Sequence, residues 1–330
     1  MTPDNNPNRP GETPGTTRSL EHFVAEVAET PLQAVDQVKE ESAPLSLWGE
    51  AWKNLRKQPL FLISAFLILV VALVSLFPGL FSPINPATEA CQLSSSNGPA
   101  TAGHPLGFTK QGCDVYARMI FGAQASVTVG LFTTLGVLLI GGIVGSIAGY
   151  YGGWIDAVLA RINDIFFALP LILGAIVLIQ VPYFRANRNP WTLVVILVVF
   201  GWPQIARITR GAVIEVRNAD FVTAARSLGV SKFSALVRHV LPNSLAPIIV
   251  VATISLGTFI VAEATLSFLG IGLPPSVMSW GNDIQAAQSS LRSNPLPLLY
   301  PAIALSITVL SFIMLGDALR DALDPKARKR

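Results

Sequence analysis

Two cysteines and three histidines are the side chains in this 330-residue chain best suited to forming covalent bonds, binding metals or transferring protons. Cys91 and Cys113 lack the CxxC spacing of a redox motif, and no activating base lies near them in the sequence. The histidines are too dispersed to indicate a metal site or a triad; they are His22, His104 and His239. The cysteines therefore form either a structural disulfide or two free thiols, and neither alternative is catalytic.

Motifs of common enzyme and cofactor sites are absent from the sequence. It has no phosphate-binding G-x-x-x-x-G-K-S/T loop, no H-E-x-x-H zinc motif and no G-x-S-x-G nucleophile elbow. We therefore predict that the chain is not an enzyme, has no catalytic residue and binds no metal, ATP or other cofactor itself.

The composition indicates which elements must carry any function. Apolar residues make up 51% of the chain and charged residues only 13%, about half of the roughly 25% in soluble domains. The net charge is +3 and the mean hydropathy is +0.54. These values exclude disorder, a coiled coil and nucleic-acid binding, and they indicate a polytopic membrane protein in the lipid bilayer.

Six charge-free stretches are candidates to cross the membrane, since about 20 apolar residues span its roughly 30 Å of hydrocarbon. They are 60–77, 126–150, 165–184, 192–206, 244–262 and 296–316. The fold class predicted is an all-α membrane protein with six transmembrane helices. Asp156, Asp164 and Glu263 lie at span edges, where we expect them to be solvated. Because ion-coupled carriers usually keep an ionisable group at membrane depth, this pattern disfavours a self-sufficient carrier.

Lysine and arginine residues near the span ends predict the orientation. With the N-terminus inside, the cytoplasmic flanks and loops carry fifteen basic residues and the outer loops five, so both termini are predicted to be cytoplasmic. The loop with both cysteines then faces the oxidising side, which favours a Cys91–Cys113 disulfide over free thiols. Such a bond would close about 22 residues and stabilise by roughly 3 kcal/mol in the chain-entropy model.

The chain thus divides into segments of different character. The polar segment 1–45 is predicted to be a disordered cytoplasmic tail, and 46–58 an amphipathic helix at the headgroup level. The remaining segments are a first transmembrane helix (59–80), an extracytoplasmic loop with the cysteine pair (81–122), five helices (123–317) and a basic cytoplasmic tail (318–330).

Three glycines at four-residue spacing indicate a helix-packing face in the second span. Gly141, Gly145 and Gly149 lie on one side of a helix, where missing side chains let another helix come close. The packing helix can belong to this chain or to a partner.

The cytoplasmic loop 207–242 is the most informative segment. A helix over 221–228 should stop at Gly229, and a second should start at Ser231 and end at His239, before Pro242 opens the next span. Two short helices with small exposed side chains would suit the groove of another protein. A plain basic loop beside the membrane is an equally good interpretation of this segment alone.

Four stretches together resemble a known family. Thr223-Ala224-Ala225-x-x-x-Gly229, followed by Arg238-His239-Val240-Leu241-Pro242-Asn243, resembles the EAA loop of ABC-importer permeases. Three more stretches resemble peptide-importer permeases: His104-Pro105-Leu106-Gly107 before Gly112-Cys113-Asp114, the run 149–156 continuing to Asp164 and Ala168-Leu169-Pro170, and 266–272 with Pro274-Pro275 and Ser279-Trp280-Gly281. The resemblance covers about 50–325 and is to the DppC/OppC-type permeases of dipeptide, oligopeptide and nickel transport.

The resemblance implies an ABC type I importer permease fold, with an ABC transmembrane type-1 domain over 123–317. Its implied place is the bacterial plasma (inner) membrane, as half of a translocation pathway. Implied partners are a homologous DppB/OppB-type permease, two ATPase subunits or one fused ATPase that bind ATP and Mg, and an extracytoplasmic substrate-binding protein. The loop 220–233 would dock into the ATPase through Phe221, Thr223, Ala224, Ala225, Leu228, Gly229 and Phe233.

Two positions depart from the family pattern. Thr223 stands where the EAA motif has Glu, and Cys113 replaces the usual Arg between Gly112 and Asp114. Peptides are the favoured substrates within the family, and nickel or another small solute is the alternative. A stand-alone carrier or channel is the competing interpretation from another class.

Overall fold

The computed structural model describes residues 47–87 and 91–323, so the predicted tail 1–45 and most of the predicted tail 318–330 lie outside the described residues. Regular structure in the described ranges is helical. The longer helices are α2 (Leu47–Leu55), α3 (Pro59–Leu76), α5 (Val115–Tyr151), α6 (Gly153–Ala168), α7 (Leu171–Ile179), α9 (Pro190–Arg217), α10 (Asp220–Ser227), α12 (Leu241–Phe268), α13 (Trp280–Ala287) and α14 (Leu296–Leu323). Short helices are α4 (Pro78–Phe81), η2 (Leu93–Ser95), α8 (Pro182–Ala186), α11 (Lys232–Ala235), η3 (Leu236–Val240) and η4 (Gln288–Ser290).

Five helical stretches of the described chain are long and apolar enough to cross a membrane. They are α3, α5, α9, the continuous run Lys232–Phe268 and α14. A sixth span would have to be the pair α6 and α7, which meet at a bend of 80°. The prediction of a single transmembrane helix over 165–184 is therefore wrong, because the stretch is divided between two helices. Pro170 disfavours helical backbone at Leu169, whose ψ of 119° is extended, so the helix breaks there.

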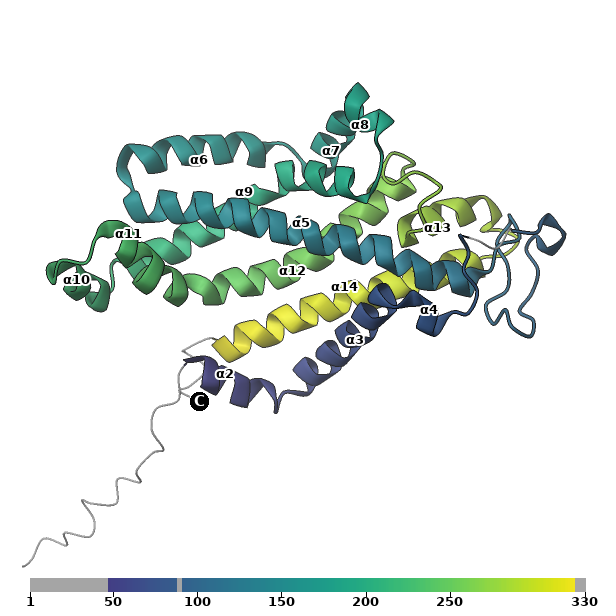
Figure 1. Cartoon of the computed structure of the whole chain (residues 1–330), viewed down its shortest axis with the longest axis horizontal. Helices are drawn as coiled ribbons and strands as arrows, with labels where there is room; N and C mark the ends of the chain where they lie inside the picture. Colours follow the sequence, from purple (N-terminus) through teal and green to yellow (C-terminus); the bar gives the residue numbers. More distant parts are fainter. Residues whose placement is uncertain (1–46, 88–90, 324–330) are drawn as a thin grey trace, which may run out of the picture. The chain divides into compact units, whose positions relative to one another are not determined.

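Helices α5, α9 and α12 pack side by side, and α14 packs against α12 and α3 (Figure 1). Helices α10 and α11 lie at one end of this bundle, which we call the α10 end. Helix α13 and the cysteine-containing loop 82–114 lie at the opposite end, the α13 end. The long helices therefore connect two chemically different ends.

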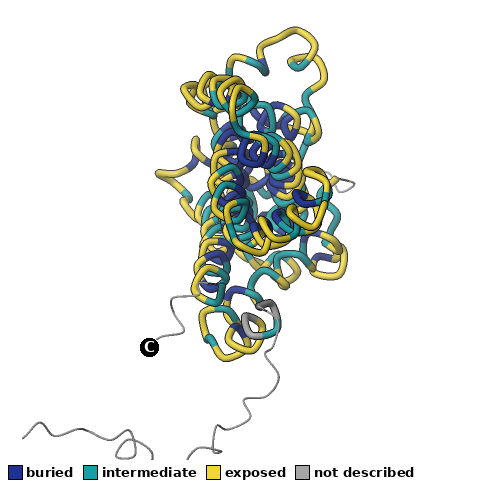
Figure 2. The backbone as a smooth tube through the Cα atoms, turned by 90° about the vertical axis from the view of Figure 1, so that its left-hand side faces the viewer, coloured by how far each residue is buried: buried dark blue, intermediate teal, exposed yellow. Residues whose placement is uncertain are grey.

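Burial is concentrated where α5, α9 and α12 meet, and the outlying helices are largely exposed (Figure 2). Leu197, Ile205 and Ile260 are examples of the buried side chains at this centre. In α3 the burial pattern is the reverse of that in a helix exposed to water: its buried residues are Ser64 and Ser75, while most of its leucines and Phe66 are exposed. Small polar residues at the contact and apolar ones outside are typical of a helix solvated by lipid.

Several helices extend beyond the predicted spans. Helix α5 begins at Val115 rather than at 123, since the Asp114 carboxylate accepts a hydrogen bond from the Ala117 N–H at 2.5 Å. Helix α9 continues to Arg217, and the next helical run already begins at Lys232. The predicted loop 207–242 is consequently reduced to the segment around α10. A helix is present within 46–58, and its position at the headgroups stays a prediction.

Candidate functional site

Helix α10 is held at the end of the bundle by one apolar anchor. Val222 is completely buried, and it belongs to a cluster with Val213 of α9, Tyr150 of α5 and the Leu236–Val240 turn. Fully burying such a side chain is worth about 1.5–3 kcal/mol. The short helix is therefore fixed to three long helices and does not hang from a flexible loop.

The end of α10 follows the geometry that its glycine predicts. Gly229 has a φ of +92°, the left-handed backbone that glycine adopts without a steric penalty. Its N–H donates to the Arg226 carbonyl at 3.0 Å, and the Val230 N–H donates to the Ala225 carbonyl at 3.2 Å. These two bonds form a Schellman motif, which satisfies carbonyls at the helix end and reverses the chain.

The second predicted helix starts as expected but does not stop. The Ser231 hydroxyl accepts from the Ser234 N–H at 3.3 Å and caps α11. The chain then passes through the π-helical turn Leu236–Val240 directly into α12. The prediction of an end at His239 is wrong: helical backbone continues through Pro242, whose missing N–H falls in the first turn of α12, and the Asn243 side-chain amide donates to the His239 carbonyl at 2.7 Å.

The tip of the α10 end exposes apolar side chains on this rigid base. Leu228 is 87% exposed, Phe233 69% and Phe221 48%. Thr223 and Ala224 are exposed beside them, and Ala225 is half-buried. Exposed apolar residues gathered on a fixed surface are typical of a contact with another protein. We call the segment Ala219–Phe233 the coupling surface, after the role that the sequence resemblance implies for it.

The three predicted packing glycines face α9 of the same chain. A β-carbon built on Gly141 would lie 2.8 Å from the Trp202 carbonyl oxygen, and one on Gly149 would lie 2.8 Å from the Arg210 carbonyl oxygen. A β-carbon on Gly145 would overlap the Ala206 carbonyl oxygen. Without side chains at these positions, α5 and α9 are in backbone contact along the half of the bundle that leads to the coupling surface.

Arginines of α9 reinforce the same joint. Arg217 donates to the Gly149 and Tyr150 carbonyls, at 2.9 and 3.2 Å, at the end of α5. Arg210 forms a two-pronged ion pair with Asp156 of α6, at 2.5 and 2.6 Å. The expectation that Asp156 is simply solvated is therefore wrong: its carboxylate ties α6 to α9.

At the α13 end, the structure joins Cys91 to Cys113 in a disulfide. The residue after Cys113, Asp114, caps α5 and also contacts the His104 ring, whose Nδ1 lies 2.7 Å from the Asp114 Oδ2. The sequence alone gave no sign of this His104–Asp114 contact, because the two residues are ten positions apart in an irregular loop. Among the described residues, no group of three or more His, Cys, Asp or Glu is placed to hold a metal.

A second ion pair joins α5 to α13. The Arg118 guanidinium donates to Asp283 Oδ1 at 2.5 and 2.8 Å, and both side chains are largely buried. Burial raises the pKa of the Asp283 carboxyl, and the Arg118 charge opposes that rise. Sequence reasoning missed this pair as well, although a charge close to an apolar stretch is itself a signal, since it persists there only with a partner.

Comparison with known proteins matches two families to the chain. Residues 141–329 match the binding-protein-dependent transport system inner membrane component, and residues 46–99 match the N-terminal TM domain of oligopeptide transport permease C. The dipeptide transport system permease protein DppC of Alkalihalophilus pseudofirmus is 36% identical, over 86% of this chain and 91% of that protein. The oligopeptide transport system permease protein OppC of Bacillus subtilis is 35% identical, over 90% and 95%. The glutathione transport system permease protein GsiD of Escherichia coli is 34% identical, also over 90% and 95%.

Solved structures with a similar fold come from transporters. Two inward-facing crystal forms of the MetNI methionine ABC transporter contain a chain that superposes with TM-scores of 0.53 and 0.51. The first is 21% identical and covers 63% of this chain and 96% of that chain, which shows the fold. The family resemblance is thus confirmed. The chain belongs to the family of binding-protein-dependent transport system inner membrane components, as a permease subunit of an ATP-driven importer.

Proposed function

We propose that this chain supplies one half of the translocation pathway of a peptide importer in the bacterial inner membrane. A homologous DppB/OppB-type permease supplies the other half, and an extracytoplasmic binding protein delivers the substrate. Two ATPase subunits, or one fused ATPase, bind ATP and Mg. The three relatives support a peptide substrate, since their names specify dipeptide, oligopeptide and glutathione transport.

The proposed orientation has six spans and both termini in the cytoplasm. It counts α6 and α7 as one broken span. The excess of basic residues in the predicted cytoplasmic loops supports it. The position of the disulfide at the end opposite the coupling surface supports it too, because disulfides persist on the oxidising side.

The observation that carries the proposal is the exposed apolar tip of the coupling surface on its buried anchor. Leu228 and Phe233 offer area to an ATPase cleft, and Val222 connects that contact to the long helices. When ATP closes the ATPase dimer, a displacement of α10 passes through the α5–α9 joint, because packed helices move as rigid bodies. The glycines and alanines of the coupling surface act through fit and carry out no chemical step.

Copurification followed by transport tests the proposal. The tagged chain is solubilised gently, and its partners are identified by mass spectrometry. We expect a second permease, ATPase subunits and a binding protein, and we expect the reconstituted complex to import labelled di- to pentapeptides with ATP. Import of nickel instead of peptides would contradict the substrate. Recovery of the chain alone, active in liposomes without ATP, would contradict the importer.

A further inference from the structure

One carboxylate of the described chain is buried without a cationic partner among its hydrogen bonds. Glu263 of α12 has no exposed surface, so the expectation that it is a solvated residue at a span edge is wrong. Its Oε1 accepts from the Ser267 hydroxyl and its Oε2 from the Ser126 hydroxyl, both at 2.8 Å. The Ser279 hydroxyl is a third polar neighbour of this carboxylate.

Each of these serines also accepts a hydrogen bond from the backbone. Ser126 accepts from the Trp280 N–H at 3.3 Å, Ser267 from the Leu273 N–H at 3.2 Å, and Ser279 from the Asn282 N–H at 3.2 Å. A hydroxyl has one proton to donate and lone pairs to accept with. Because the Ser126 and Ser267 hydroxyls donate to Glu263, their lone pairs are available to the backbone, and the carboxylate thus orients these two serines.

The backbone groups reached in this way belong to the segment between the last two long helices. Leu273 lies in the loop 269–279, and Trp280 and Asn282 form the first turn of α13. The three serines come from α5, from α12 and from the end of the loop itself. Glu263 therefore stands where α5, α12 and the start of α13 meet, 137 residues along the chain from Ser126.

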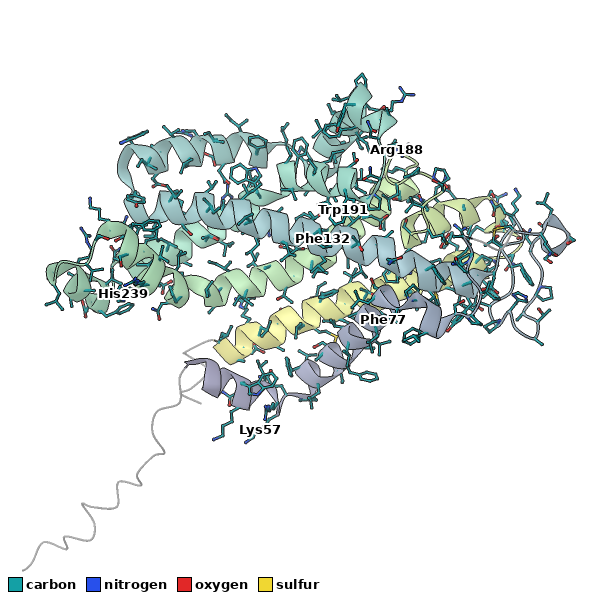
Figure 3. The ribbon with its side chains drawn as sticks, viewed as in Figure 1. Lys57, Phe77, Phe132, Arg188, Trp191 and His239 are labelled. Atoms are coloured by element: carbon teal, nitrogen blue, oxygen red, sulfur yellow. A yellow bond between two sulfur atoms is a disulfide. The ribbon has the colours of Figure 1, made fainter. Side chains whose placement is uncertain are left out.

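Two further side chains donate hydrogen bonds to backbone carbonyls of the same loop. Asn282 donates to the Pro274 and Val277 carbonyls, at 2.9 and 2.8 Å. Arg188, labelled in Figure 3, donates to the Gly270 and Gly272 carbonyls, at 3.1 and 2.7 Å. Backbone groups of the loop and of the start of α13 are thus bonded to Asn282, to Arg188 and to the serines beside Glu263. Glu263 is the side chain that links the contact with α5 to the contact with α12.

A carboxylate at this place needs an explanation, because an apolar residue would fill the volume without the cost of removing a charge from water. We propose that Glu263 is a positioning residue for transport: through Ser126 and Ser267 it fixes the loop 269–279 and α13 to α5 and α12. The α13 end of the bundle then moves as one rigid body with α5 when the coupling surface is displaced. The inference rests on the proposed importer function.

The test compares two substitutions of Glu263 in the assembled complex, reconstituted in liposomes with its binding protein. Glu263→Ala removes the acceptor of the Ser126 and Ser267 hydroxyls, whereas Glu263→Gln keeps an acceptor oxygen and offers N–H donors to hydroxyl oxygens. Ser306→Ala is the matched control, since the Ser306 hydroxyl is exposed and bonds only within its own helix, to the Ala302 carbonyl. The readouts are the maximal rate of peptide uptake, the binding-protein concentration at half-maximal uptake, and the ATPase rate.

We expect Glu263→Ala to lower the maximal uptake rate about tenfold, with the half-maximal concentration and the basal ATPase rate within about twofold of the parent. Glu263→Gln and Ser306→Ala should stay within about twofold of the parent in all three. Hydrogen exchange should become about tenfold faster over 270–287 in Glu263→Ala and stay unchanged in the coupling surface.

Three results would overturn the positioning role. They are parental uptake in Glu263→Ala, unchanged exchange over 270–287, and a Glu263→Gln variant as impaired as the alanine variant. If Glu263→Ala does not assemble, Ser126→Ala and Ser267→Ala, which each remove one link, must show the same selective loss. Failure of the importer function itself would show differently, as a parent complex without ATP-driven uptake.

Discussion

The two ends of this permease are held by different kinds of contact. The α10 end depends on an apolar anchor, Val222, and exposes apolar side chains such as Leu228. The α13 end depends on directional polar contacts, namely the Glu263 cluster and the Arg118–Asp283 pair, together with a disulfide. A small docking element needs only one anchor when a partner covers the rest. Long loops beyond the helix bundle have little core of their own, so polar contacts and a covalent bond must set their position.

The joint between α5 and α9 is the region that both ends share, and breaking it should have the largest effect. In Gly145→Leu the new side chain would overlap the Ala206 carbonyl, a backbone atom that cannot move without separating the helices. We expect a loss of about 3 kcal/mol or more, seen as a strong fall in the yield of monodisperse protein and in the melting temperature in detergent.

Gly142→Leu is the matched control for this prediction, since nothing lies within 4 Å of a β-carbon at Gly142 in the same helix. It should fold as the parent does. Equal loss in both variants would show that α5 does not tolerate bulk anywhere, and that the close approach of α9 is not the cause.

Removing the disulfide should loosen the α13 end alone. In the Cys91→Ser, Cys113→Ser double variant, we expect the loop to lose roughly 3 kcal/mol of local stability, because a bridge over about 22 residues restricts the open loop. Limited proteolysis between 82 and 114 should accelerate while ATPase copurification stays intact. Loss of the ATPase in this variant would mean that the two ends do not act separately.

Placing a charge on the coupling surface should weaken ATPase binding and leave the α13 end unchanged, which is the reverse of the result expected for the disulfide variant. Leu228→Glu changes a side chain that is 87% exposed, so the chain should fold normally, but a desolvated carboxylate would oppose ATPase docking. We expect copurified ATPase and peptide uptake to fall about tenfold, which corresponds to about 1.4 kcal/mol. Leu93→Glu, at a leucine that is 77% exposed in the disulfide loop, is the control and should retain the ATPase.

The smallest effect is expected from a substitution that strains the backbone of the coupling surface. Gly229→Ala meets no atom within 4 Å, so its cost is purely conformational, about 1 kcal/mol for a φ of +92°. Hydrogen exchange over 220–230 should accelerate about fivefold. In Gly211→Ala, which is equally open but lies inside α9, the same change should leave exchange unchanged or slower.

Local signals in the sequence were enough to predict several of these features. The membrane class, the glycine face of α5, the end of α10 at Gly229 and the cap at Ser231 all depend on a few neighbouring residues. Their information is short-range stereochemistry: what glycine, proline or a capping hydroxyl permits in the backbone next to it. The family resemblance was equally accessible, because its motifs are contiguous.

Tertiary structure alone decided the rest. It determined that α9 is the helix that the glycines of α5 contact, that Leu236–Val240 carries the chain through into α12, and that Asp156 and Glu263 are engaged rather than solvated. The hydrogen bond between Ser126 and Glu263 joins residues 137 positions apart, and nothing local marks Ser126 as the partner of Glu263. Whether a carboxylate beside an apolar stretch meets water or a ring of hydroxyls depends on which helices pack around it, and that choice is made by the whole chain at once.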